Sequence, residues 1–336
     1  MAKGSGKYRP ISGMQLPRYS GICTFMRLPY LPAEQADDLD IALLGLPWDG
    51  GTTTRTGARH GPRQIREMST LLRSVHPTSG INPYSLLNCA DVGDAPTNPV
   101  DPVRTMRMLE DFVAALVAKG AAPLSFGGDH LVSLPVLRAL KPKQPLAMVH
   151  FDAHSDMYDY YYEDAKFTHG TPFRRAVEEG LIDPKKTIQI GIRGTYFATN
   201  EHEWCLQQGI RQVGMDELRN EGPDAIAAKV RATVGRTPAY LTFDIDALDP
   251  SFAPGTGVPE IAGVSTYEAQ RILRGLRGLD FVGGDFVELC PPVDPTGNSA
   301  LVAANLGFEI LCLLAESVSA RQASSGVRHR STKVKK

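Results

Sequence analysis

The stretch "LAMVHFDAHSD", residues 146–156, starts as an apolar run and ends in a polar motif. Short runs of aliphatic, β-branched and aromatic residues predict buried strands. Asp152, His154 and Asp156 follow this run at every second position. Side chains two positions apart share one face of an extended chain. The stretch therefore predicts a buried strand that carries three polar side chains toward one point where the chain leaves the core.

Five further segments have the same apolar character and are bounded by Gly, Pro or Asp. They are 41–47, 123–128, 187–193, 239–246 and 281–289. Segments with helical character alternate with the strands, at 102–119, 132–140, 172–180, 223–234, 266–278 and 299–317. This alternation is typical of a parallel sheet covered by helices. We therefore predict an α/β fold with a mostly parallel sheet.

The domain organisation follows from length and from the ends of the chain. The 336 residues fit one large α/β domain or two ordinary ones. Because no repeat and no linker interrupts the alternation, we predict a single α/β domain at 29–320. Residues 1–28 are interpreted as an extended arm, and the polar, basic residues 321–336 as a disordered tail.

The composition argues against several classes of protein. The formal net charge of -1 argues against a general nucleic-acid or anionic-membrane binder. Cysteines without a C-x-x-C pair are typical of reduced thiols in an intracellular protein. No apolar run of membrane-spanning length and no signal peptide is recognised, so we expect a cytoplasmic protein. The basic start of the chain keeps a mitochondrial presequence as the alternative.

Polar residues follow four of the predicted strands at the same end. In folds of this class the ligand site lies beyond the carboxyl ends of the strands. The residues are Asp129 and His130, then Asp152, His154 and Asp156, then Asp244, Asp246 and Asp249, and finally Asp285 and Glu288.

Several carboxylates held close together would raise one another's pKa values unless a cation neutralised them. Four aspartates and two histidines exceed the needs of one ion, so we expect two ions that share bridging aspartates. An oxygen-rich set with imidazole and no thiolate favours Mn²⁺, with Co²⁺, Ni²⁺ or Zn²⁺ as alternatives. Any one of these aspartates taken alone fits a helix cap or a turn, and we assign Asp129 and Asp249 to turns. His150 is expected to be buried on the face opposite His154, and no chemistry is assigned to His60, His76, His202 or His329.

Three motifs carry a resemblance to a known family. "GGDH" (127–130), "FDAHSD" (151–156) and "FDIDALDPSFAPGTGVPE" (243–260) resemble the signatures of the manganese ureohydrolases, which include arginase, agmatinase, guanidinobutyrase and guanidinopropionase. The resemblance extends from about residue 14 to about residue 320. It implies a three-layer α/β/α fold, two Mn²⁺ per subunit, a trimer or hexamer, and hydrolysis of a guanidino compound to urea and a primary amine.

The resemblance also implies roles for individual residues. "THGTPF" carries His169 at the position of a proton-shuttling histidine, and "DFVELCPP" carries Glu288 at the position of a carboxylate that pairs with the substrate guanidinium. Asp156 is expected to handle the proton of the attacking water. The implied ligands of one ion are His130, Asp152, Asp156 and Asp244, and those of the other are His154, Asp152, Asp244 and Asp246, so that Asp152 and Asp244 bridge.

The substrate is predicted from segments outside these motifs. "DMYDYYYEDAKFTHG" (156–170) replaces an asparagine-bearing stretch of arginase and is closer to the agmatinase branch. Segments 13–29, 47–62 and 291–317 most resemble guanidinopropionase and guanidinobutyrase. We therefore expect a linear guanidino acid, 3-guanidinopropionate or 4-guanidinobutyrate, with agmatine as the alternative. The mixed charges of loop 157–168 do not decide between a carboxylate and an ammonium tail. Candidate partners for a carboxylate are Arg55, Arg59 and Arg193.

Two different classes of protein remain as alternatives. A single-zinc amide hydrolase of the deacetylase type keeps a D-x-H pair and one further aspartate. The presence of His130 with both Asp244 and Asp246 favours two metals instead. A binding protein without activity on the same fold is the second alternative, and the intact ligand set argues against it.

Overall fold

The computed structural model describes residues 7–324, and they form one eight-stranded sheet in the order β2-β1-β3-β8-β7-β4-β5-β6. All neighbouring strands that pair do so in parallel. The predicted parallel sheet is therefore confirmed. The strands are β1 (Ile41–Gly45), β2 (Cys89–Asp94), β3 (Ala122–Phe126), β4 (Leu146–Phe151), β5 (Ile182–Ile192), β6 (Arg211–Gly214), β7 (Ala239–Asp244) and β8 (Phe281–Val287).

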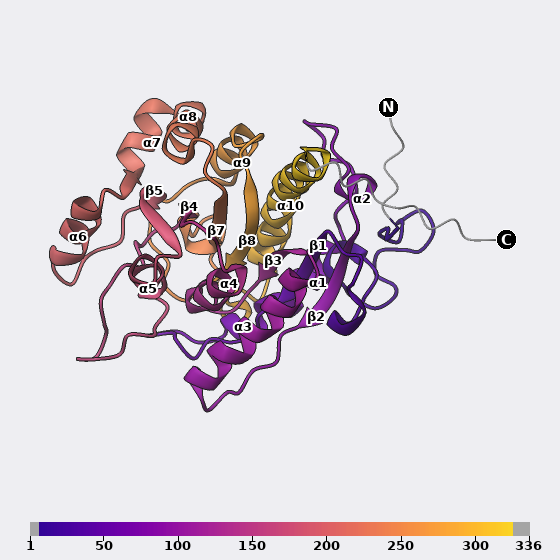
Figure 1. Cartoon of the computed structure of the whole chain (residues 1–336), viewed down its shortest axis with the longest axis horizontal. Helices are drawn as coiled ribbons and strands as arrows, with labels where there is room; N and C mark the ends of the chain where they lie inside the picture. Colours follow the sequence, from indigo (N-terminus) through magenta and orange to yellow (C-terminus); the bar gives the residue numbers. More distant parts are fainter. Residues whose placement is uncertain (1–6, 325–336) are drawn as a thin grey trace.

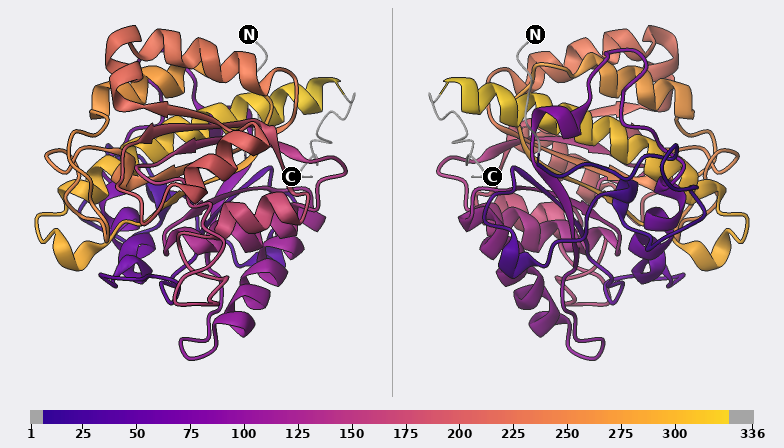
Figure 2. Two further views of the ribbon diagram at one scale, coloured as in Figure 1. Left: turned by 90° about the vertical axis from the view of Figure 1, so that its left-hand side faces the viewer. Right: turned by 90° about the vertical axis from the view of Figure 1, so that its right-hand side faces the viewer.

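Helices cover both faces of the sheet, as the three-layer prediction requires (Figure 1; Figure 2 shows the same layers from two sides). One layer contains α3, α4 and α5, and the other contains α1, α8, α9 and α10. The helices are α1 (Gly61–Ser69), α2 (Pro83–Leu86), α3 (Pro102–Ala118), α4 (Ser133–Leu140), α5 (Pro172–Glu178), α6 (Asn200–Gln208), α7 (Met215–Glu221), α8 (Pro223–Val234), α9 (Thr266–Gly275) and α10 (Asn298–Ser324).

Alternating strand residues separate two hydrophobic cores. Leu43 and Phe151 face the layer that contains α10, whereas Leu44 and Met148 face the layer that contains α3 and α4. Because side chains of a strand alternate between faces, a strand buried on both sides reads as a continuous apolar run. This is why the central strands are visible in the sequence.

The strands that end in the predicted polar residues lie side by side. The sheet order makes β3, β8, β7 and β4 consecutive neighbours. Since all of them are parallel, their carboxyl ends meet at one edge of the sheet. The fold therefore gathers the four polar motifs of the sequence in one region.

The described parts of two segments predicted to lie outside the domain are ordered in the structure. The ring of Phe25 stacks on Phe126 with 4.4 Å between centroids, so the last part of the predicted arm is buried. Residues 321–324 of the predicted tail are the last turn of α10, and 325–336 lie outside the described residues. A single domain at 29–320 stays our proposal.

Helix α10 is long and apolar enough to cross a membrane by length and composition, which the sequence analysis did not anticipate. Of its most apolar 18-residue window, 78% is buried inside the protein. Its buried residues pack against β8 and α1, and they belong to the core between the sheet and its outer layer. We therefore interpret α10 as a core helix.

Candidate metal centre

A tight turn brings His130 to the edge of the sheet. Gly127 and Gly128 adopt φ values of 84° and 76°, and a Cβ atom on Gly128 would lie 2.5 Å from the carbonyl oxygen of Leu46. Only glycine fits such a position without strain. Asp129 then caps the short helix that starts at His130, accepting from Leu131 N at 3.1 Å. Asp129 is therefore a structural residue, as a helix cap and not as the predicted turn residue.

His130 is the centre of the first group of predicted ligands. Its Nδ1 lies 3.0 Å from Asp152 Oδ2, 2.9 Å from Asp156 Oδ2 and 3.2 Å from Asp244 Oδ2. Its Nε2 lies 2.8 Å from the hydroxyl of Thr242, which fixes the ring so that Nδ1 faces the carboxylates. Three aspartates from two strand ends therefore converge on one imidazole nitrogen.

His154 forms a second group with Asp152 and Asp246. Its Nδ1 lies 3.2 Å from Asp246 Oδ2 and 3.5 Å from Asp152 Oδ1. Backbone amides hold the carboxylates: Asp246 N donates to Asp244 Oδ1 at 2.8 Å, and Ala153 N donates to Asp246 Oδ1 at 3.0 Å. The two groups share Asp152, so all the predicted ligands lie around two neighbouring points.

The donor set fits divalent cations. His130 Nδ1 is buried and makes no hydrogen bond of acceptable geometry within residues 7–324, although three carboxylate oxygens are within 3.2 Å. A buried nitrogen without a hydrogen bond, close to three carboxylate oxygens, is the arrangement expected of metal ligands around a cation.

The raised pKa values of two carboxyl groups indicate that the site has too little positive charge to neutralise its carboxylates. Burial, followed by the charges of Asp246 and Asp152, raises the pKa of Asp244 well above its usual range. Burial and Asp152 likewise raise the pKa of Asp246 to about 6. Burial opposes ionisation of Asp152 as well, but the neighbouring histidines outweigh it and lower the pKa of that carboxyl well below its usual range.

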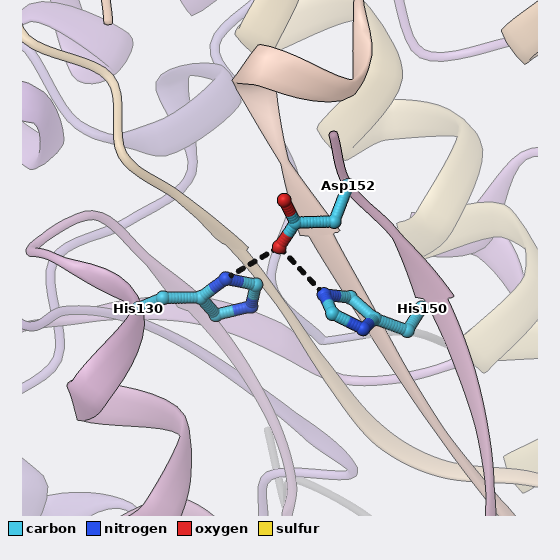
Figure 3. A group of neighbouring side chains, drawn as sticks. All are labelled: His130, His150 and Asp152. Carbon is cyan, nitrogen blue, oxygen red and sulfur yellow. Dashed lines mark hydrogen bonds and ion pairs between the residues drawn. The ribbon is translucent and has the colours of Figure 1, made fainter. Parts of the chain in front are cut away.

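His150 is closer to the centre than the sequence suggested. It is fully buried, as expected, but its Nε2 lies 2.7 Å from Asp152 Oδ2 (Figure 3). The expected position on the face opposite His154 was wrong, because residues separated by two or four positions share a face of a strand. His130 and His150 approach the same oxygen of Asp152 from two sides.

Glu288 and His169 lie together beside the metal ligands. Glu288 Oε1 accepts from the backbone of His130 at 2.9 Å and lies 3.0 Å from His169 Nδ1. Burial lowers the pKa of His169, but the hydrogen bond and the charge of Glu288 outweigh it and raise that pKa to about 9. His169 Nε2 lies 2.8 Å from the hydroxyl of Thr53. Hydrogen-bond partners on both sides of the ring therefore orient His169.

Two of the predicted catalytic residues have unusual backbone conformations. Asp156 and Glu288 have φ values of 53° and 62°. Such conformations cost of order 1–3 kcal/mol for residues other than glycine, and they occur preferentially at functional sites. The chain therefore accepts local strain to aim these two carboxylates.

A cavity of about 380 Å³ opens above the ligands. Its lining includes His154, Asp244 and Asp246, together with Glu288 and His169. The remaining wall is rich in aromatic residues, several of which the sequence analysis did not select. They include Tyr158, Tyr161, Tyr162, Tyr196 and Phe197.

Glu201, at the start of α6, also lines the cavity and was missed, because α6 shows no clear apolar periodicity in the sequence. The side chain is buried, and neither oxygen has a hydrogen-bond partner of good geometry among residues 7–324. Burial raises its pKa to about 7. The cavity therefore contains a carboxyl group that changes charge near neutral pH.

The other polar residues of the sequence analysis have structural partners. Asp285 is buried and accepts from Ser133 Oγ and Tyr240 Oη, both at 2.6 Å. Asp249 accepts from Ser251 N at 2.9 Å within its loop, which confirms a turn residue. Arg193 donates to backbone carbonyls that include Asp246 O at 2.8 Å and Glu260 O at 2.7 Å. Arg59 pairs with the buried Asp49, and Arg55 Nε donates to Gly257 O at 2.8 Å.

Comparison with known sequences agrees with this geometry. The sequence profile of the arginase family matches residues 39–313 of this chain. The chain is 53% identical over 311 residues to a guanidinopropionase of Pseudomonas aeruginosa, covering 93% of this chain and 97% of that protein. It is 44% identical over 310 residues to a guanidinobutyrase of the same organism, covering 91% and 97%.

Solved structures show the same fold. The proclavaminate amidino hydrolase of Streptomyces clavuligerus superimposes with a TM-score of 0.86 at 39% identity, covering 90% of this chain and 99% of that one. A formiminoglutamase of Trypanosoma cruzi, whose structure is described as containing Mn²⁺, superimposes with a TM-score of 0.74 at 25% identity, covering 83% and 94%.

Proposed function

This chain belongs to the arginase family of amidinohydrolases, and on that premise we propose that it hydrolyses a linear guanidino acid, 3-guanidinopropionate or 4-guanidinobutyrate, to urea and an amino acid. The observation that carries the choice of substrate is the 53% identity with guanidinopropionase over nearly the whole of both chains. Agmatine is the alternative substrate, since relatives named agmatinase are also similar.

We propose that the two ligand groups hold two Mn²⁺ ions. His130, Asp152, Asp156 and Asp244 would bind one ion, and His154, Asp152, Asp244 and Asp246 the other. Two such ions, when bound, would lower the pKa of a water molecule that they share and so supply a nucleophile near neutral pH. The mainly oxygen donors and the absence of thiolate from the group support manganese. A single-zinc deacetylase-like site is less well supported, because it would leave the second group of ligands without a role.

The protein's own residues would bind and orient the substrate. Oε1 of Glu288 is occupied by His130 N and His169 Nδ1, whereas no hydrogen bond to Oε2 is found within the described part of the chain. That oxygen is therefore available for the flat guanidinium, with which a carboxylate makes charge-assisted hydrogen bonds. Fixing the guanidinium carbon in this way would lower the activation barrier, because the substrate loses its translational and rotational entropy on binding and not in the reaction step.

Proton transfer would involve Asp156 and His169. Asp156 would accept a proton from the attacking water, and His169 would donate one from its ring to the departing amine. In the metal-free protein the pKa of His169 is raised to about 9, which favours the protonated ring that a proton donor needs. Charge on the bound ions would lower this pKa and make the proton easier to transfer.

A panel of guanidino compounds tests the proposed function. With added Mn²⁺, urea release should give a kcat/KM for 3-guanidinopropionate or 4-guanidinobutyrate at least about tenfold above that for agmatine or arginine, which corresponds to about 1.4 kcal/mol. Chelated protein serves as the control for contaminating activity. A preference for agmatine would establish the alternative, and urea from none of the four compounds would favour a binding protein without activity.

The pH dependence of KM discriminates between a substrate that ends in a carboxylate and one that ends in an ammonium group. Glu201 is neutral below its pKa of about 7 and negative above it. A substrate carboxylate should therefore bind more weakly as pH rises from 6 to 8, by at most about tenfold for each pH unit, because one proton is linked. An ammonium tail should show the opposite trend. In Glu201→Gln both trends should disappear, and a pH trend that survives this substitution would remove Glu201 from substrate recognition.

The oligomeric state, the partners and the cellular location of the protein are also proposed. We propose a homo-oligomer, a trimer or hexamer, without nucleic-acid or membrane partners. The net charge of -1 and the burial of α10 support the absence of nucleic-acid and membrane partners. We further propose a cytoplasmic location, with the mitochondrion as the alternative, because relatives named mitochondrial are among those that match. Light scattering on the purified protein would measure the oligomeric state.

A further inference from the structure

A row of polar side chains crosses the sheet next to the metal ligands. His150 on β4 is in register with Gln189 on β5, and Gln189 is in register with Gln212 on β6. Hydrogen bonds join their side chains: Gln189 Nε2 lies 3.0 Å from His150 Nδ1, and Gln212 Nε2 donates to Gln189 Oε1 at 2.8 Å. At the far end, His202 Nδ1 lies 2.7 Å from Gln212 Oε1. The row therefore runs from the candidate metal centre to α6.

The orientation of the Gln189 amide fixes the direction of these hydrogen bonds. Gln189 Nε2 donates to the carbonyl oxygen of Ser155 at 2.7 Å, and a carbonyl can only accept. The amide nitrogen must therefore be where it is drawn, and its second hydrogen points to His150 Nδ1. The oxygen of the same amide, Gln189 Oε1, accepts from Gln212 Nε2. Since His150 Nδ1 must accept, the neutral ring carries its proton on Nε2.

We propose that His150 is a positioning residue for Asp152, with its tautomer set by Gln189, and is not a metal ligand. By distance alone, His130, His150 and Asp152 form a group that could hold an ion. However, Nδ1 of His150 is occupied by Gln189, and a protonated Nε2 has no lone pair for a cation. That Nε2–H instead donates to Asp152 Oδ2 at 2.7 Å (Figure 3). It would hold the carboxylate that both groups of ligands share.

Packing supports a fixed ring. Phe173 on α5 packs against both imidazoles, with ring centroids 4.6 Å from His150 and 4.9 Å from His130, and the two imidazole centroids lie 5.1 Å apart. His150 and Gln189 are fully buried, so water does not compete for their hydrogen bonds. A donor held this firmly restricts the rotamer of Asp152 before any cation arrives, and such supporting hydrogen bonds typically change metal affinity or activity by about 10–100-fold.

The tautomer can be measured without metal or substrate. In metal-free protein labelled with ¹⁵N-histidine, ring correlation spectra should show His150 as the Nε2-protonated tautomer, with its signals assigned by their loss in His150→Gln. Gln189→Glu should add a proton at Nδ1 and make the ring positively charged, because a carboxylate accepts where the amide donated while Asp152 still accepts from Nε2–H. Nδ1 protonation of His150 in the unaltered protein would overturn the proposal. This measurement does not depend on the proposed function, whereas the role of Asp152 as a ligand does.

Mn²⁺ titration of metal-free variants tests the positioning role. Gln189→Glu and His150→Leu should each weaken binding by about 10–100-fold while the number of ions bound stays that of the unaltered protein. His150→Gln, which keeps a donor, should restore part of the affinity. His76→Gln is the matched control, because His76 is a buried histidine paired with Glu309 on a different element.

Two results of this titration would contradict the positioning role. One is an unchanged affinity in Gln189→Glu. The other is the loss of one whole ion in His150→Leu alone, which would make His150 a ligand. If His150→Leu does not fold, the Gln189 variant and the ring spectra still decide. Absence of Mn²⁺ binding in the unaltered protein would instead contradict the proposed function and leave the tautomer result standing.

Discussion

Asp244→Ala is expected to reduce urea release to the background of the assay and to leave the protein unable to retain its metal ions. Asp244 Oδ2 lies 3.2 Å from His130 Nδ1, and Oδ1 accepts from Asp246 N at 2.8 Å, so the side chain stands between the two groups of ligands. Its removal would deprive both proposed ions of a ligand. His154→Ala should have the same effect through one ion only. Metal content per chain and initial rates of urea formation measure both.

The stability of an Asp244 variant should change with opposite signs in the two metal states. Burial and then Asp246 and Asp152 raise the pKa of Asp244. In the metal-free protein, the folded state therefore favours the protonated carboxyl, and stability falls as pH rises above the unfolded-state pKa of about 4. At pH 8 with chelator, Asp244→Asn should therefore unfold at a higher temperature than the unaltered protein.

With Mn²⁺ present, the order should reverse. The unaltered protein should gain about 2.7 kcal/mol for each site at a free metal concentration one hundred times Kd, and the variant should gain much less. Asp285→Asn is the matched control: it removes a buried carboxylate that accepts from Ser133 and Tyr240, so stability should fall in both conditions while metal is retained. Near-normal turnover by Asp244→Ala would count against the two-ion centre.

The sequence predicted the interior of the sheet better than its edges. β4 and β7 are buried on both faces and read as apolar runs, so their positions were predicted to within two residues. β6 was missed because it is four residues long and begins with the exposed Arg211. β2, at the opposite edge, ends with the exposed Asp94 and was missed as well. β6 lacks the two-sided burial that produces a recognisable pattern, whereas residues 89–92 of β2 are buried but Asp91 interrupts their apolar run.

The residues of the candidate site also fall into those that the sequence predicted and those that it could not. Alternate spacing within one strand end is enough to bring Asp152 and His154 together, and it did so here. The pairing of His169 with Glu288 depends on loops that are far apart in the sequence, so only the family resemblance suggested it. The His150–Gln189–Gln212 row depends on the register between strands, which a single sequence does not contain. Glu201 was missed because its helix carries no clear apolar stripe.

Glu288→Gln is expected to keep the metal ions and lose most of the turnover. The glutamine carbonyl can still accept from His130 N, which Glu288 Oε1 does at 2.9 Å, so the local backbone should stay in place. The charge that would pair with the guanidinium is removed. Loss of one partner from a buried charge pair costs about 2–5 kcal/mol, or roughly 30- to 5,000-fold in kcat/KM. Urea kinetics and metal analysis of the same preparation measure the two effects separately.

A second readout links the substitution to His169. Because Glu288 contributes most to raising the pKa of His169 to about 9, ahead of the charges of Asp156 and Asp129, Glu288→Gln should lower that pKa toward its ordinary value. Ring ¹⁵N titration of the metal-free protein measures this. Glu309→Gln is the control, because Glu309 is a buried carboxylate paired with His76 and Arg274 and should leave both His169 and turnover unchanged. If Glu288→Gln loses metal while the His169 pKa stays at about 9, Glu288 acts as a ligand and the proposed guanidinium contact is wrong.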